Sequence, residues 1–246
     1  MTFSPKSRFE ARIPDVVVFA PFAEIEKHSS IEWIVSNTLS KLSNVTIVRC
    51  NKAFNKLCIS MRLHRISLSD SEVKKDLVCK ECIRKKNAWN NDLKATKLEF
   101  VPNDLLNDID LRNGLRKLKS NFHPNDFIYH GIPLGNIAAY DLIIENKLLD
   151  GKIPDSLRDE FELLVMQSWS AFSYANELFE NNHYTFLIVF DHLYSINRAF
   201  VEAALHNGLK IISIGRRPTR DLLDLFITID LLDESLDPLN NLYRCW

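Results

Sequence analysis

The sequence has no surplus of charge of either sign. Its 246 residues include 31 Lys and Arg against 32 Asp and Glu, for a formal net charge of −1. A chain without a basic field has nothing general to attract a phosphate backbone, so we expect no nucleic-acid partner. No apolar run approaches the roughly 20 residues that span a bilayer, so we expect no transmembrane segment. The polar start, Met1 to Arg12, lacks the apolar core of a signal peptide. These absences predict a cytoplasmic protein, at most peripheral to the inner membrane.

The familiar catalytic signatures are missing as well. The chain has no Walker loop, no dinucleotide glycine fingerprint, no nucleophile elbow and no His-Glu zinc motif. Each of these motifs sets backbone N–H groups, a nucleophile or metal ligands in a fixed geometry. ATPase, dehydrogenase and hydrolase functions therefore lack their usual support in this sequence.

Short β-branched runs alternate with helical patterns, which predicts an α/β fold with a Rossmann-like parallel sheet flanked by helices. We expect one domain over 1–246, in which 51–130 is a mainly helical insertion. The expected strands are 15–20, 45–50, 184–191, 209–215 and 225–230. The expected helices are 31–42 behind a cap at Ser29 or Ser30, 70–91, 102–120, 134–150, 154–181 and 195–207, with a helical turn at 219–223.

Four of the five cysteines, Cys50, Cys58, Cys79 and Cys82, fall within 33 residues. Two residues separate the last pair, a spacing that lets both thiolates face one tetrahedral ion at ~2.3 Å. Basic residues surround this pair and would offset the charge of a four-thiolate site. We therefore predict a structural zinc ion on these four ligands, with an iron–sulfur cluster as the second choice. Ordinary buried thiols are the alternative.

Ligands of parallel sheets bind beyond the carboxyl ends of the strands, where the strand order reverses. This rule selects polar residues after three expected strands. Among the polar residues that it places at the mouths of these loops are His28, Asp191 and His192. The candidate substrate-binding residues are Tyr194, Ser195, Asn197, Arg198, Gly215, Arg216 and Arg217. Backbone N–H groups at the start of the helix 195–207 are expected to accept an anion, although Ser195 is also a simple helix cap.

Four stretches carry a resemblance: Val48-Arg49-Cys50, Cys58 with 78–82, the Gly-Pro-Gly segment 131–140, and 193–200. In this order they resemble the N-terminal region of bacterial, cyanobacterial-type capsule-polysaccharide biosynthesis glycosyltransferases. The resemblance implies a GT-B arrangement of two Rossmann-like domains. Its N-terminal domain holds a saccharide or lipid-linked acceptor, and its C-terminal domain binds the sugar nucleotide donor. The chain departs from the family at Ile214-Gly215-Arg216-Arg217, where relatives carry a histidine and glycines.

The resemblance thus implies the acceptor-side domain of a sugar-nucleotide-dependent glycosyltransferase in capsule or surface polysaccharide synthesis. A transferase of this class needs a general base to deprotonate the acceptor hydroxyl, and the resemblance implies His28, Asp191 and His192 as the candidate catalytic bases. The sequence ends at Trp246, so a donor-binding C-terminal domain or partner chain would have to complete the enzyme. We expect the chain alone to be inactive. The residues leave a second interpretation open, a non-catalytic binding or scaffold module stabilised by a metal ion.

Overall fold

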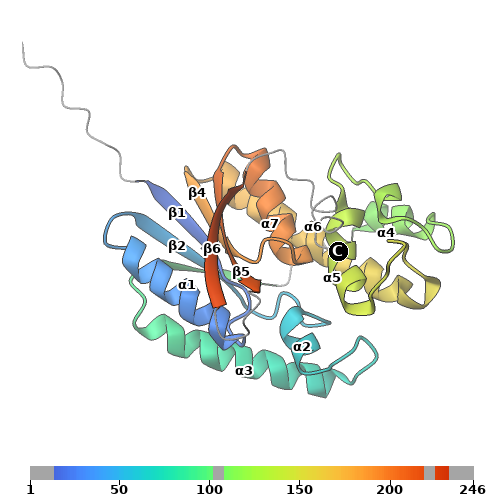
Figure 1. Cartoon of the computed structure of the whole chain (residues 1–246), viewed down its shortest axis with the longest axis horizontal. Helices are drawn as coiled ribbons and strands as arrows, with labels where there is room; N and C mark the ends of the chain where they lie inside the picture. Colours follow the sequence, from blue (N-terminus) through green and yellow to red (C-terminus); the bar gives the residue numbers. More distant parts are fainter. Residues whose placement is uncertain (1–13, 102–107, 219–224, 233–246) are drawn as a thin grey trace, which may run out of the picture.

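A sheet of six strands forms the centre of the computed structural model, which describes residues 14–101, 108–218 and 225–232 (Figure 1). The strand order is β3-β2-β1-β4-β5-β6. β1 to β5 run parallel, and β6 runs antiparallel to β5. The strands are β1 (Asp15–Phe19), β2 (Asn44–Cys50), β3 (Thr96–Phe100), β4 (Phe186–Phe190), β5 (Lys210–Pro218) and β6 (Leu225–Leu232). The predicted Rossmann-like α/β fold is confirmed.

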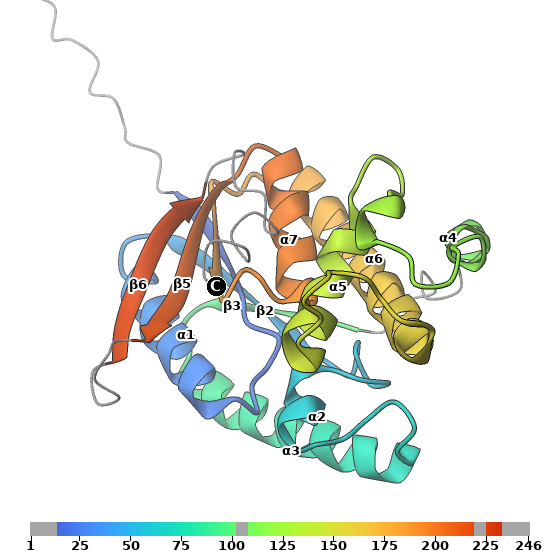
Figure 2. The same ribbon diagram turned by 45° about the vertical axis from the view of Figure 1, so that its right-hand side comes forward.

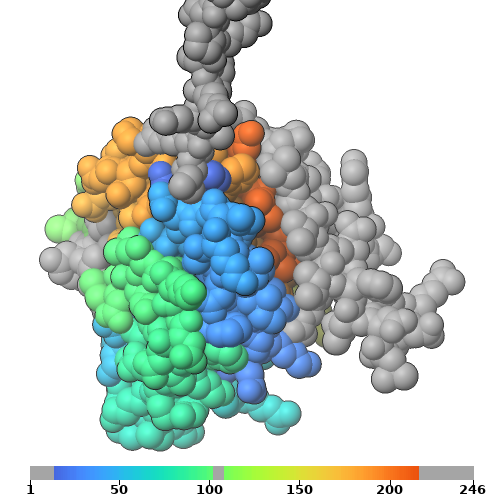
Figure 3. Space-filling view, turned by 90° about the vertical axis from the view of Figure 1, so that its left-hand side faces the viewer, coloured from blue at the N-terminus to red at the C-terminus, as the bar shows by residue number. Residues whose placement is uncertain are grey.

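Helices cover both faces of this sheet (Figures 1 and 2). They are α1 (Glu26–Leu39), α2 (Ile59–Leu63), α3 (Glu72–Asn91), α4 (Ile109–Arg116), α5 (Leu134–Asn146), α6 (Arg158–Glu180) and α7 (Ser195–His206), with 3-10 turns at Pro124–Asp126 and Asp155–Leu157. α1 and α3 lie side by side on one face and form a continuous surface in Figure 3. Trp33 of α1 contacts Trp89 of α3, with ring centroids 6.3 Å apart. α5, α6 and α7 cover the other face. Among the described residues, no helix is long and apolar enough to cross a membrane.

The core lies on both faces because both are covered, as is usual for a parallel sheet. Alternate residues of β1 point to opposite sides, so Val17 and Phe19 pack toward the larger core, whereas Val16 and Val18 join the smaller one. Phe19 stacks on Phe200 of α7, with centroids 3.8 Å apart and planes 9° from parallel. This packing fixes α7 against the centre of the sheet.

α1 differs from its prediction in both its start and its buried face. It begins at Glu26, and Ser29 lies inside it, where its hydroxyl donates to the Ala23 carbonyl at 3.1 Å. The apolar residues of 31–42 recur at helical spacing and predict a buried face that includes Ile34, but this side chain is 55% exposed. Ile31, Val35 and Leu39 do pack against the core, and Ser29, Glu32 and Ser36 are buried beside them. The reason is an ion pair between Glu32 and Arg49 of β2, which turns a polar side of the helix toward the sheet.

The expected insertion 51–130 contains α2 and α3, and then an unpredicted strand, β3, at the edge of the sheet. Three of the five β3 residues are exposed, so the strand has no apolar run by which it could be predicted. Part of the expected helix 102–120 is α4; positions 102–107 and the expected turn at 219–223 lie outside the described residues.

Candidate functional site

The strand order places a topological switch point between β1 and β4. From β1 the chain moves outward through β2 and β3, then returns to β4 on the other side of β1. The loops that follow β1 and β4 diverge there into α1 and α7. A parallel sheet offers its ligand crevice at such a point, beyond the carboxyl ends of the strands.

His28 and Asp191 meet at this switch point. His28 Nε2 lies 4.0 Å from Asp191 Oδ2, with side chains 16% and 36% exposed. The His28 ring packs on Phe190, with centroids 3.9 Å apart. Asp191 has a positive φ of 50°. The Asn197 side chain supports this turn by donating to the Phe190 carbonyl at 2.6 Å and the Asp191 carbonyl at 3.2 Å.

His192 and Tyr194 continue the same loop. His192 Nδ1 lies 2.6 Å from the hydroxyl of Ser213 on β5, which orients the imidazole. Burial raises the pKa of Tyr194, and the nearby Asp191 and Asp141 raise it further, so its hydroxyl stays protonated at neutral pH. Sequence reasoning missed Ser213, whose only signal is a lone hydroxyl within the apolar run 211–214.

The start of α7 is held by a carboxylate from α5. The Asp141 carboxylate accepts hydrogen bonds from the Ser195 backbone N–H at 3.0 Å and the Ser195 hydroxyl at 2.7 Å. The cap residue is Tyr194, so Ser195 does not cap the helix as expected. Burial raises the pKa of Asp141, against the lowering effect of these hydrogen bonds. The anion expected at this helix end is thus the chain's own Asp141, which sequence reasoning missed.

The remaining predicted substrate-binding residues lie elsewhere. Arg198 is buried and pairs with Glu202 one turn along α7. Both residues line a groove whose lining includes neither His28 nor Asp191. Gly215, Arg216 and Arg217 were expected in a loop, but their backbone belongs to β5 and pairs with β6. The side chains of Arg216 and Arg217 lie outside what the structure describes.

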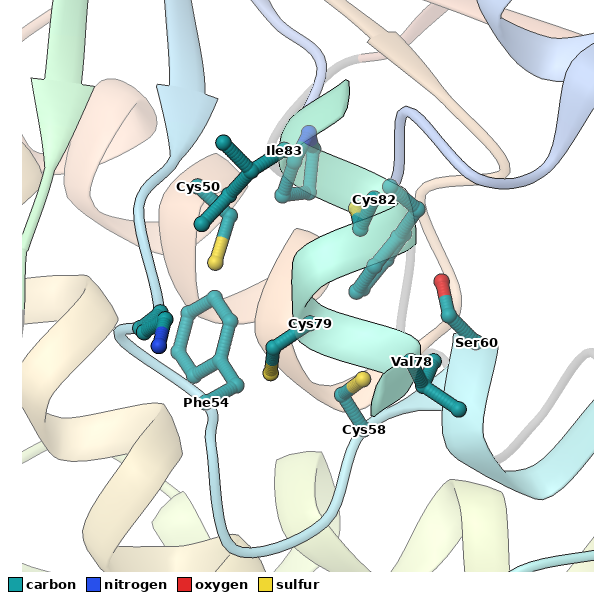
Figure 4. A pocket seen from close by; sticks show the side chains of 11 residues that line it. Cys50, Phe54, Cys58, Ser60, Val78, Cys79, Cys82 and Ile83 are labelled. Carbon is teal, nitrogen blue, oxygen red and sulfur yellow. The ribbon is translucent and has the colours of Figure 1, made fainter. Parts of the chain in front are cut away.

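The four clustered cysteines line one pocket (Figure 4). Cys50 ends β2, Cys58 directly precedes α2, and Cys79 and Cys82 lie on α3. All four are free thiols. Within the described part of the chain, however, no three His, Cys, Asp or Glu side chains approach closely enough to hold one metal ion. This geometry contradicts the predicted site for a single zinc ion.

No family model matches the sequence, and no curated protein matches it either. Among solved structures, a CDPS (cyclodipeptide synthase) from Fluoribacter dumoffii is similar, with a TM-score of 0.49 and 14% identity over 81% of this chain and 88% of that one. A cyclo(L-leucyl-L-phenylalanyl) synthase has a TM-score of 0.43 and 10% identity over 90% and 92% of the two chains. The tyrosyl-tRNA synthetase of Leishmania major has a TM-score of 0.37 and 13% identity over 82% and 32%.

These findings correct the glycosyltransferase interpretation. The similar structures are cyclodipeptide synthases and a tRNA synthetase, and no family model supports a capsule-polysaccharide enzyme. The resemblance, and the acceptor-domain function drawn from it, are therefore wrong. The stretches that carried it are the end of β2, a segment of α3 and the starts of α2, α5 and α7, which are local elements that proteins of many functions share. The alternative, a scaffold module stabilised by a metal ion, is not supported either, because the described residues hold no single-ion site. At these identities the similarity concerns the fold alone, and we infer no activity from it.

Proposed function

We propose that the chain binds a small polar molecule at the switch point between β1 and β4, and that His28 and Asp191 exchange a proton with it. The observation that carries this proposal is the 4.0 Å approach of the two side chains. His28 lies in the first turn of α1, which follows β1, and Asp191 directly follows the adjacent strand β4. A histidine beside a carboxylate is suited to general acid–base chemistry near neutral pH, because the carboxylate stabilises the imidazolium form.

The surroundings of the pair support a positioned role. Asp191 adopts the left-handed backbone conformation, which costs an L-residue roughly 1–2 kcal/mol. Asn197 is buried and holds the carbonyls on both sides of this turn. The Phe190 ring packs against the imidazole of His28. Backbone strain of this kind persists where neighbouring contacts enforce it, and it concentrates at functional sites.

Mapping of bound ligands by NMR tests the proposal. The ¹⁵N-labelled full chain would be screened against mixtures of nucleotides, amino acids, sugar phosphates and carboxylic acids. We expect the compounds that bind to shift amide signals in 20–28 and 191–195, the two loops of the switch point. Binders that shift only signals around Arg198 and Glu202, in the separate groove of α7, would overturn the proposal.

A further inference from the structure

We propose that a cavity beside α4 binds a small phosphorylated molecule that also has an apolar part. The cavity has a volume of ≈ 680 Å³, which is within the usual range of small-molecule sites. Figures 1 and 2 show α4 at the edge of the molecule, beyond α6 from the sheet. The lining includes neither His28 nor Asp191, so this second site is independent of the function proposed above.

A contact between distant segments builds one wall of the cavity. Phe122 and Ile153 form an isolated antiparallel bridge, in which the Ile153 N–H donates to the Phe122 carbonyl at 3.0 Å. The bridge brings Lys152 beside the segment 117–123, and both contribute to the lining. The cavity is therefore enclosed by parts of the chain that tertiary contacts hold together.

Arg158, at the start of α6, holds the same segment in place. Its guanidinium donates to the carbonyls of Leu118, at 3.3 Å, and Lys119, at 2.7 Å. It also lies over the Phe122 ring, 5.2 Å from the centroid. Carbonyl oxygens repel an anion, and here two of them are bound by a cation. The segment thus has a fixed backbone before any ligand binds.

Three lysines give the lining its charge. Lys117, Lys119 and Lys152 are exposed, and among the described residues none of their ammonium groups pairs with a carboxylate. The exposed Lys74 and Lys80 of α3 differ, because each pairs at 2.8 Å with an aspartate one helical turn away. Like charges that gather without a local counter-charge repel one another. Binding of an anion between them is therefore favourable, and lysine is a common ligand of phosphate.

A turn provides a further donor and engages the carboxylate of Asp126, which also lines the cavity. Asp126 accepts a hydrogen bond from the His123 backbone N–H at 3.2 Å, and the Asn125 N–H donates to His123 Nδ1 at 3.2 Å. Because Nδ1 is the acceptor, the neutral imidazole carries its proton on Nε2. Nε2 is then the donor that this ring offers to a phosphate oxygen.

The lining also has an apolar side, which Leu118, Phe127 and Ile128 provide. Ile128 is 63% exposed, although its side chain is large and apolar. The organic part of a ligand would cover this side, so a phosphate ester fits the lining better than inorganic phosphate does. A polyanion is not favoured, because the net charge of −1 gives the chain no wider basic field.

Titration of the ¹⁵N-labelled full chain with phenyl phosphate tests the proposal. We expect shifts of the amide signals of 117–123, 126–128 and Lys152, and a Kd that rises with ionic strength because the lysines are exposed. Lys152→Gln should raise this Kd about fivefold. Lys41→Gln, which replaces an exposed lysine just after α1, is the matched control and should leave the Kd unchanged.

Two smaller probes test each part of the ligand on the wild-type chain, without a variant. Phenol, which lacks the phosphate, should not shift the signals of 117–123. Inorganic phosphate should shift them but bind about tenfold more weakly than phenyl phosphate, because it leaves the apolar side uncovered. Inorganic phosphate that binds as tightly as phenyl phosphate would overturn the assignment to an organic phosphate.

Three other results would overturn the proposal as a whole. They are equal shifts with phenol and phenyl phosphate, an equal Kd in Lys152→Gln and Lys41→Gln, and shifts of 117–123 with an oligonucleotide but not with phenyl phosphate. Signals of 20–28 and 191–195 report on the switch point separately. Either proposal can therefore fail while the other holds.

Discussion

Ser195 donates two hydrogen bonds to the carboxylate of Asp141, at 3.0 Å from its backbone N–H and 2.7 Å from its hydroxyl. Asp141 lies on α5 and Ser195 begins α7, so this contact joins two helices across 54 residues of sequence. It also fixes the end of the loop that presents Asp191 and His192. The positions of the candidate catalytic residues therefore depend on a carboxylate outside their own loop.

Replacing Asp141 by Ala should destabilise the fold by about 2 kcal/mol. The change leaves two donors at the start of α7 without their acceptor, and such groups are costly when buried. Urea unfolding measures the change. Asp150→Ala is the matched control, because Asp150 is exposed and accepts one local hydrogen bond, from the Lys152 N–H at 3.2 Å. Equal unfolding midpoints for the two variants would contradict the role given to Asp141.

Gly135 should not tolerate a side chain, whereas Gly114 should. A Cβ at position 135 would overlap the carbonyl oxygen of Pro124, and the Gly135 N–H already donates to the Phe127 carbonyl at 3.0 Å. We expect Gly135→Ala to lower the free energy of unfolding by about 3 kcal/mol.

The same substitution at position 114 serves as its control. There the new Cβ would meet only the edge of the Phe127 ring, at 3.3 Å, inside helix α4. The gain in helix propensity offsets that contact, so stability should stay within about 1 kcal/mol of wild type. Thermal unfolding compares the two variants. A stable Gly135→Ala protein would show that α5 does not pack as closely on 124–127 as described.

Stability should fall as the pH rises from 5 to 7 because of Glu32. Burial raises its pKa from 4.5 to about 7, against the lowering effect of Arg49. Between these two values the folded state binds more protons than the unfolded state, so the free energy of unfolding decreases with pH and levels off above 7. The loss is on the order of 2 kcal/mol. Urea unfolding at both pH values should show this loss in wild type and in Glu26→Gln, an exposed position of the same helix, but not in Glu32→Gln. The same slope in all three proteins would contradict the assignment.

Much of the fold follows from local patterns. The apolar runs predicted β1, β2, β4, β5 and β6 within a few residues. For the central strands β1, β2 and β4 the reason is that buried strands of a parallel sheet are apolar on both faces. β3 was not predicted, because an edge strand can remain polar. The burial of polar residues on α1 was not predicted either. It depends on the pairing of Glu32 with Arg49, and the hydrophobic periodicity of one helix carries no information about a partner in a distant segment.

Part of the candidate site could also be predicted from the sequence. The rule that ligands bind beyond strand ends selected His28 and Asp191, which the structure brings within 4.0 Å of each other. Spacing in the sequence also singled out the four cysteines that line one pocket. Asp141 and Ser213 were missed, since each matters only through a partner 54 or 21 residues away. The glycosyltransferase resemblance failed because its stretches are short local elements, one strand end and several helix starts, and proteins of many functions share such elements.

The central claim, that the switch point holds the ligand, is tested most directly by calorimetry with a compound identified in the NMR screen. Wild type would be compared with Asp191→Asn and with His183→Gln, an exposed histidine at the opposite end of β4. We predict a Kd at least tenfold weaker for Asp191→Asn, a loss of about 1.4 kcal/mol, and an unchanged Kd for His183→Gln. Equal affinity in all three proteins would contradict the claim.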